Sequence, residues 1–153
     1  MKSFLEKVLL PILTGMVVIL LVQTPPKVTA DTADTFFATY FSKVTQANQR
    51  HSLYENDLTS SYRSFENWSS YVNFWKTQAS VTAAPAIPTQ GNPDEFTVTL
   101  TFHPAQGKIS EDTVDYFLTC KGFLGAVLAR DIVSGCPPSY IEIDRSQSSY
   151  STH

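Results

Sequence analysis

The chain has 153 residues, of which 42% are apolar and 16% are charged, and its formal net charge is -3. This length allows one ordinary domain with a terminal appendage and leaves little room for a second core. The negative net charge, without any run of Lys or Arg, excludes an electrostatic nucleic-acid-binding protein, and an aromatic content of 12% excludes disorder over most of the chain.

Residues 1–30 have the pattern of a signal peptide or a membrane anchor. Two lysines precede an uncharged, mostly apolar run over residues 8–22, which as a helix reaches about 22 Å, short of the ~30 Å hydrocarbon core. Small residues before and at Ala30 suit a signal peptidase. Two alternatives stay open: cleavage after Ala30, or an uncleaved segment that is the only contact with the membrane. Both predict an extracytoplasmic domain, secreted, periplasmic or anchored, over residues 31–150.

Cys120 and Cys136 are the two cysteines of the chain, and both fall in the exported part. An even number of cysteines in an oxidising compartment favours a disulfide over two free buried thiols or a metal site. The chain has no Cys-x-x-Cys motif, and its three histidines lack ligand-like spacing around the cysteines. We therefore predict a Cys120–Cys136 disulfide, and no metal ion or cofactor.

The first half of the exported part shows helical periodicity. Apolar residues spaced three and four apart predict an amphipathic helix over residues 34–47, and residues 52–57 suit a short second helix. A third helix is expected after Ser64, its predicted N-cap. Its apolar stripe comprises Phe65, Trp68, Tyr71, Val72 and Trp75.

The second half shows strand periodicity. Residues 95–103 (EFTVTLTFH) alternate between apolar and polar side chains, which predicts a half-buried antiparallel strand. One face of this strand carries Phe96, Val98, Leu100 and Phe102, and the other carries Thr97, Thr99, Thr101 and His103.

Further strands are expected over residues 113–121 and 139–145, with a short one over residues 81–84. Residues 85–93 form a predicted turn or linker because they hold three prolines, and residues 124–133 are expected to form a loop. Helices followed by antiparallel strands indicate an α+β fold, with N-terminal helices packed on a curved antiparallel sheet.

The segment between the predicted second helix and the end of the third resembles nuclear-transport-factor-2-like domains, which have a cystatin-like, cone-shaped fold. The resemblance rests on a Tyr-bearing first helix over residues 37–44 and on two further motifs. These are Leu58, Thr59 and Tyr62 in a Leu-Thr-x-x-Tyr turn, and Tyr71, Phe74 and Trp75 at a Tyr-x-x-Phe-Trp helix end. The closest likeness is to extracytoplasmic domains of bacterial membrane proteins, including some bacterial protein kinases. Such a superfamily hosts enzymes, binding modules and assembly factors.

No catalytic residue is predicted. The resemblance implies that an enzyme of this kind, such as an isomerase or dehydratase, would carry an Asp, His or Tyr inside the cone. The inward positions of the clearest strand are all apolar, and Glu111 and Asp112 have the pattern of turn and surface acids. His103 falls on the threonine face. The enzyme is therefore the alternative, and a non-catalytic binding or interaction module is the main interpretation.

Two surfaces could carry such a role. The resemblance implies a pocket between the helices and the concave sheet, suited to a small apolar or flat ligand. Its expected lining is Tyr40, Tyr71, Trp75, Phe102 and Tyr116. The alternative is that these aromatic side chains fill the cone as core and leave no pocket. The second surface is the threonine face, formed by Thr97, Thr99, Thr101 and His103. It could bind a second copy of the chain, giving a homodimer, or another protein of the cell envelope, for which the domain would be an assembly or scaffold protein.

Overall fold

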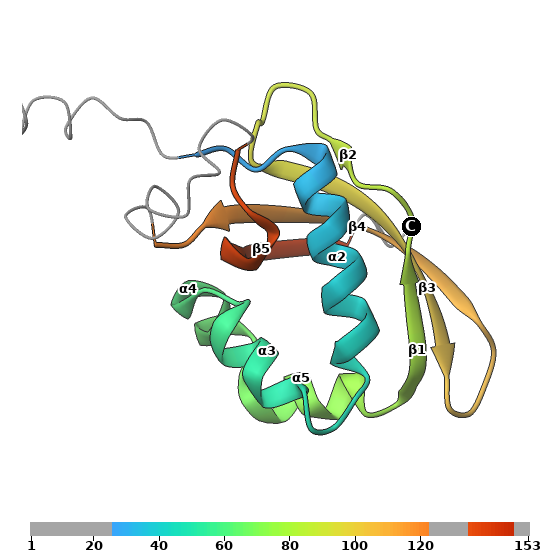
Figure 1. Cartoon of the computed structure of the whole chain (residues 1–153). Helices are drawn as coiled ribbons and strands as arrows, with labels where there is room; N and C mark the ends of the chain where they lie inside the picture. Colours follow the sequence, from blue (N-terminus) through green and yellow to red (C-terminus); the bar gives the residue numbers. More distant parts are fainter. Residues whose placement is uncertain (1–25, 123–134, 149–153) are drawn as a thin grey trace, which may run out of the picture.

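A computed structural model describes residues 26–122 and 135–148 (Figure 1). In this part of the chain, four helices precede the strands of one antiparallel sheet, so the predicted α+β class is confirmed. The helices are α2 (Ala30–Val44), α3 (Arg50–Asn56), α4 (Ser60–Phe65) and α5 (Trp68–Trp75), and a 3-10 turn, η1 (Pro138–Tyr140), precedes the last strand. The strands are β1 (Gln78–Ala83), β2 (Ile87–Pro88), β3 (Glu95–Pro104), β4 (Ser110–Cys120) and β5 (Ile141–Ser148). The apolar run over residues 8–22 and the predicted loop over residues 124–133 lie outside the described residues.

The sheet has the strand order β1-β3-β4-β5, and β2 pairs with β3 beyond the end of β1. The alternation predicted for residues 95–103 is confirmed, since Phe96, Val98 and Leu100 are buried on one face of β3. The register of β3 against β4 pairs Phe96 with Tyr116 and Leu100 with Asp112. The inner face of the sheet therefore carries the even-numbered residues of both strands.

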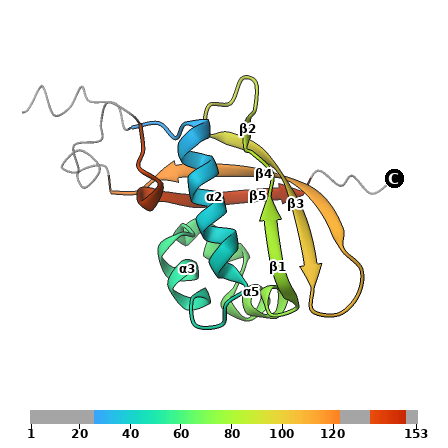
Figure 2. The ribbon, with the colours of Figure 1, turned by 45° about the vertical axis from the view of Figure 1, so that its right-hand side comes forward.

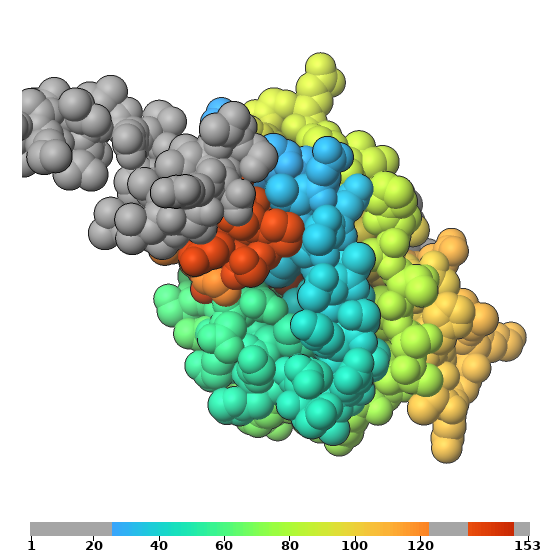
Figure 3. Space-filling view, in the orientation of Figure 1, coloured from blue at the N-terminus to red at the C-terminus, as the bar shows by residue number. Residues whose placement is uncertain are grey.

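Helix α2 lies in the bend of the sheet, and its outer side forms part of the molecular surface (Figures 1, 2 and 3). It begins with a capping box between Thr29 and Thr32, which satisfies backbone donors of its first turn. Its other end is held by Arg50, which is 8% exposed and donates to the carbonyl oxygens of Val44 (2.9 Å) and Thr45 (2.6 Å). Its buried face comprises Ala33, Phe36, Phe37, Tyr40, Phe41 and Val44.

The predicted third helix is wrong in its start and length, because two short helices occupy this segment. Asn67 is the reason: its side chain accepts a hydrogen bond from the backbone N–H of Ser70 and caps α5. An Asn that satisfies backbone donors in this way favours a cap over a helix interior. The predicted N-cap Ser64 lies within α4, whose N-cap is Thr59. Phe65, expected in the buried stripe, is 88% exposed.

The folded domain begins before residue 31. Val28 is only 6% exposed and belongs to the core, and Thr29 caps α2. The Lys27 carbonyl accepts a hydrogen bond of 2.8 Å from the backbone N–H of Cys136. Gly135 makes this approach possible, since it has a φ of +93° and a Cβ there would lie 2.8 Å from the Lys27 oxygen. Cleavage after Ala30 would remove all of these contacts.

The predicted disulfide is confirmed. Cys120, at the end of β4, is bonded to Cys136, and their Cα atoms are 5.9 Å apart. Cys136 is fully buried, so the bond ties the segment leading into β5 to the end of the neighbouring strand. A disulfide is consistent with an oxidising compartment. None of the helices in the described part of the chain is both long enough and apolar enough to cross a membrane.

Opening the disulfide should destabilise the domain. We expect Cys120→Ser to lower the free energy of unfolding by about 2–4 kcal/mol, because it removes a cross-link over a sequence separation of 16 residues. Chemical denaturation of the variant and the parent measures the difference. Rapid alkylation of both cysteines in the native, unreduced protein would contradict the bond.

Removal of residues 26–30 should also destabilise the fold. A chain that starts at Asp31 loses the buried Val28 and the Thr29 cap, so we expect its unfolding free energy to be about 2–4 kcal/mol lower than that of a chain starting at Pro26. Thermal and urea denaturation of the two chains compare them directly. Equal stabilities would show that the segment contributes nothing to the fold.

Candidate functional site

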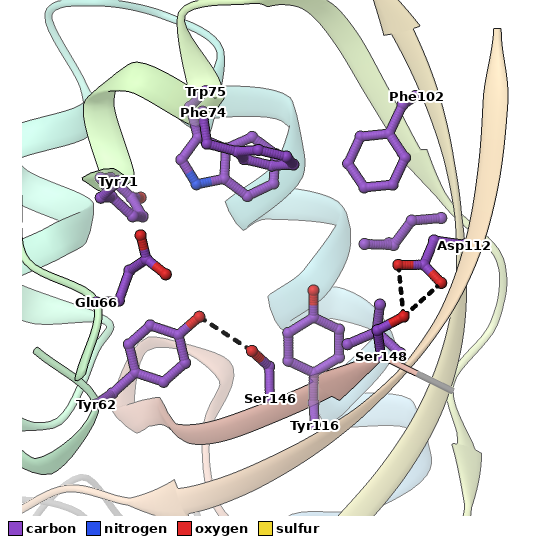
Figure 4. A pocket seen from close by; sticks show the side chains of 12 residues that line it. Tyr62, Glu66, Tyr71, Phe74, Trp75, Phe102, Asp112, Tyr116, Ser146 and Ser148 are labelled. Atoms are coloured by element: carbon purple, nitrogen blue, oxygen red, sulfur yellow. Dashed lines mark hydrogen bonds between the residues drawn. The ribbon is translucent and has the colours of Figure 1, made fainter. Parts of the chain in front are cut away.

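A pocket of about 230 Å³ lies between the two short helices α4 and α5 and the inner face of β3, β4 and β5 (Figure 4). Two helices and three strands that follow later in the sequence therefore share one cavity. The lining side chains are Tyr62 and Glu66 from the end of α4, Tyr71, Phe74 and Trp75 from α5, Leu100 and Phe102 from β3, Asp112, Val114 and Tyr116 from β4, and Ser146 and Ser148 from β5.

Aromatic rings form one side of the pocket. Trp75 and Phe102 lie 6.4 Å apart between ring centres in a stacked arrangement, and Phe74 contacts both of them edge-on, at 4.8 Å from Trp75 and 5.9 Å from Phe102. Trp75 is buried, whereas Phe74 is 48% exposed at the rim. These three rings give the pocket a flat apolar wall.

Tyr116 supplies a polar group in the middle of the cavity. Its ring packs against Phe37 and Phe41 of α2, with ring centres 5.0 Å and 6.2 Å away, and the residue is only 6% exposed. Its hydroxyl points into the pocket and has no hydrogen-bond partner among the described residues (Figure 4). Burial raises the pKa of Tyr116, so the phenol is protonated at neutral pH. A phenol hydroxyl that opens into a pocket can both donate to and accept from a ligand.

Tyr71 lines the pocket, and Tyr40 lies behind it. Their hydroxyls are joined by a buried hydrogen bond of 2.9 Å, which links α5 to α2. Burial raises the pKa of Tyr71, and burial together with the neighbouring Tyr71 raises the pKa of Tyr40. Both phenols are therefore neutral and occupied with each other. Tyr40 does not line the pocket, but lies behind Tyr71 and lines a separate hollow of about 410 Å³ between α2, α3 and η1.

Two carboxylates lie on opposite sides of the cavity (Figure 4). The Ser148 hydroxyl donates to both oxygens of Asp112, at 2.9 Å and 3.0 Å. Glu66 has no hydrogen-bond or ion-pair partner for its carboxylate among the described residues, and burial raises its pKa. Of the described residues that line the pocket, none is Lys, Arg or His.

Four of the five aromatic residues predicted to line the pocket do line this cavity, and Tyr40 does not. The two acids were not predicted to lie there. Asp112 was expected at a turn or on the surface because the second strand was predicted to begin at residue 113. Strand β4 begins at Ser110, so Asp112 lies opposite Leu100 on the inner face. Because every second residue of a strand faces the same side of the sheet, the position of Tyr116 predicts that Asp112 faces inward once the strand is extended to Ser110. Glu66 had no such signal, since its position depends on the break between α4 and α5.

The threonine face lies on the other side of the sheet from the pocket. Thr97 donates to Asp115 (2.6 Å), and the Thr99 and Thr113 hydroxyls are 3.2 Å apart. Thr101 donates to Glu111 at 3.4 Å, and His103 pairs with Ser80 of β1. The three threonine hydroxyls are thus used within the sheet.

Comparison of the chain with protein-family models, with curated proteins and with solved structures gave no match. Within residues 26–122 and 135–148, no three His, Cys, Asp or Glu side chains group closely enough to hold a metal ion. Function is therefore inferred from the shape and chemistry of the pocket itself.

The partnered and unpartnered tyrosines should respond differently to loss of the hydroxyl. We expect Tyr40→Phe to lower the unfolding free energy by about 1–2 kcal/mol, because it leaves the Tyr71 hydroxyl unpaired. Tyr116→Phe removes a hydroxyl that bonds to no described residue, so stability should stay within about 0.5 kcal/mol of the parent or rise. Urea denaturation measures both, and a larger loss for Tyr116→Phe would contradict the assignment.

Proposed function

We propose that the domain is a non-catalytic extracytoplasmic binding module that holds a small molecule in this pocket. The observation that carries the proposal is Tyr116, a residue that is only 6% exposed and whose hydroxyl, unpartnered within the described part of the chain, opens into the cavity (Figure 4). The hydroxyl is therefore free to bond a molecule that enters the cavity, and one such hydrogen bond would add to the apolar contacts with the pocket wall.

The size and wall of the pocket support a ligand with one flat apolar ring. The cavity of about 230 Å³ is smaller than the roughly 300–1,000 Å³ of pockets for drug-sized ligands. A single ring fits beside Trp75 and Phe102, and a polar substituent would then reach the Tyr116 hydroxyl.

We also propose that the fold is the cone-shaped roll of nuclear-transport-factor-2-like domains. In favour of this assignment are the helix α2 inside the bend of an antiparallel sheet and a pocket between helices and inner sheet face. The Tyr71, Phe74 and Trp75 motif of the resemblance supplies three of the pocket side chains.

A small isomerase or dehydratase is a second candidate, and the two carboxylates favour it. Burial raises the pKa of Glu66, which brings a carboxyl group closer to the range useful for general acid–base catalysis. Binding ranks first because the unpartnered hydroxyl requires only a ligand, whereas turnover also requires a reacting atom placed between defined acid and base groups.

Recognition of a second copy or an envelope protein through the threonine face ranks third. The hydroxyls of Thr97, Thr99 and Thr101 already bond to groups on β4. A partner on this face would find few unpaired hydroxyls and would depend on the shape of the surface.

Two-dimensional NMR of the isotope-labelled protein tests the binding proposal with three one-ring probes: benzyl alcohol, benzylamine and benzoate. We expect at least one probe to shift the resonances of residues around the pocket, in α5, β3, β4 and β5. Tyr116→Phe should weaken that binding about 2–10-fold, the value of one hydrogen bond. Tyr140→Phe, which changes a phenol that does not line the pocket, is the matched control and should leave the affinity unchanged.

Two results would go against this function. Probes that shift no pocket resonance, or bind equally well to Tyr116→Phe, would remove the support for a ligand at Tyr116. Conversion of a bound probe into a new compound, seen in the probe's own spectrum, would favour the enzyme.

A further inference from the structure

We propose that the pocket selects a small organic cation, a protonated amine attached to a flat apolar group, over neutral and anionic molecules of the same shape. This inference rests on the proposed binding function and names the chemical class of its ligand.

The charge of the pocket wall points to a cation. Glu66 and Asp112 face the cavity from opposite sides, and no basic side chain lies among the described lining residues. The ion pair found in the described part of the chain joins Lys121 to Asp57, so neither pocket carboxylate is neutralised by a salt bridge there. A partly buried carboxylate without a counter-charge is unfavourable, and a bound cation supplies that charge.

Two arginines that lie close in sequence to pocket residues have other partners. Arg63 donates to the carbonyl oxygens of Glu55 (2.7 Å) and Leu58 (2.8 Å). The Arg145 guanidinium lies 3.8 Å from the ring centre of Phe117, which belongs to the odd-numbered, outer face of β4. Neither guanidinium bonds to Glu66 or Asp112 in the described structure.

The aromatic wall suits the same ligand. Trp75, Phe74 and Phe102 present rings to the cavity, and the negative face of an aromatic ring attracts an ammonium group. The acids alone would not define a site. Tyr116 is the second, independent feature, because the residue is 6% exposed and its hydroxyl lacks a partner among the described residues and lies between the two carboxylates (Figure 4).

An ammonium group complements the Glu66 and Asp112 carboxylates in charge, and it complements them and the Tyr116 hydroxyl in hydrogen bonding. It carries donors and no acceptor, whereas carboxylates accept hydrogen bonds and a tyrosine oxygen can accept one. Charge-assisted hydrogen bonds of this kind are stronger than neutral ones. A carboxylate ligand would instead face two like charges, and an alcohol would gain no ionic attraction.

The test compares benzylamine with benzyl alcohol, which have nearly the same shape and differ in charge at neutral pH. Titration of the full chain by NMR should give an affinity for benzylamine at least tenfold higher than for benzyl alcohol. Raising the salt concentration should weaken the binding of the amine and leave that of the alcohol nearly unchanged. This salt arm needs no mutation, so it is valid even where a variant fails to fold.

Variants then assign the preference to the two acids. Glu66→Gln and Asp112→Asn should each lower the affinity for benzylamine about 3–10-fold without changing that for benzyl alcohol. Glu111→Gln is the matched control, because Glu111 neighbours Asp112 on β4 but bonds to Thr101 on the outer face, and it should change neither affinity.

The outcomes separate this inference from the function on which it rests. Equal binding of the amine and the alcohol at the pocket, both weakened by Tyr116→Phe, would overturn the cation preference and keep the binding module. An affinity for the amine that stays unchanged in both acid variants would also overturn it. Absence of benzylamine, benzyl alcohol and benzoate from the pocket would overturn the proposed function itself.

Discussion

Phe37 and Phe41, one turn apart on α2, pack against the ring of Tyr116 in β4. This contact places the helix inside the bend of the sheet and fixes the ring from which the pocket hydroxyl projects. From the same buried face, α2 is joined to α5 by the hydrogen bond between Tyr40 and Tyr71. Because α2 holds α5 in place, the space between α5 and the strands stays partly open. The pocket thus depends on the aromatic side chains of α2, which contact both the sheet and α5.

Elements whose burial follows one simple period were predictable from the sequence. The alternation over residues 95–103 gave a strand because one face is core and the other is polar, and the spacing of apolar residues in α2 gave a helix for the same reason. The segment of α4 and α5 was not predictable in this way. The spacing of its apolar residues fits one long helix or two short ones. The hydrogen bond by which Asn67 caps α5 favours two short helices, and Phe65 is left exposed. Val28 was assigned to a processing site although it fills part of the core.

The residues of the candidate site likewise fall into predictable and unpredictable ones. Four of the predicted aromatic residues line the pocket: Tyr71, Trp75, Phe102 and Tyr116. Their positions follow from which strand or helix face is apolar. Tyr40 lies one layer deeper, because depth depends on tertiary packing that periodicity does not encode. Asp112 and Glu66 were missed because their direction depends on where β4 begins and where α4 ends, and boundaries are the least predictable feature of an element.

A crystal structure of the protein grown with benzylamine would show whether the pocket holds an organic cation. We expect electron density for the ring of the compound beside Trp75 and Phe102, with its nitrogen within hydrogen-bond distance of the Tyr116 hydroxyl and of a carboxylate oxygen of Glu66 or Asp112. A cavity filled by the protein's own side chains, or a Tyr116 hydroxyl bonded to another protein group, would contradict it.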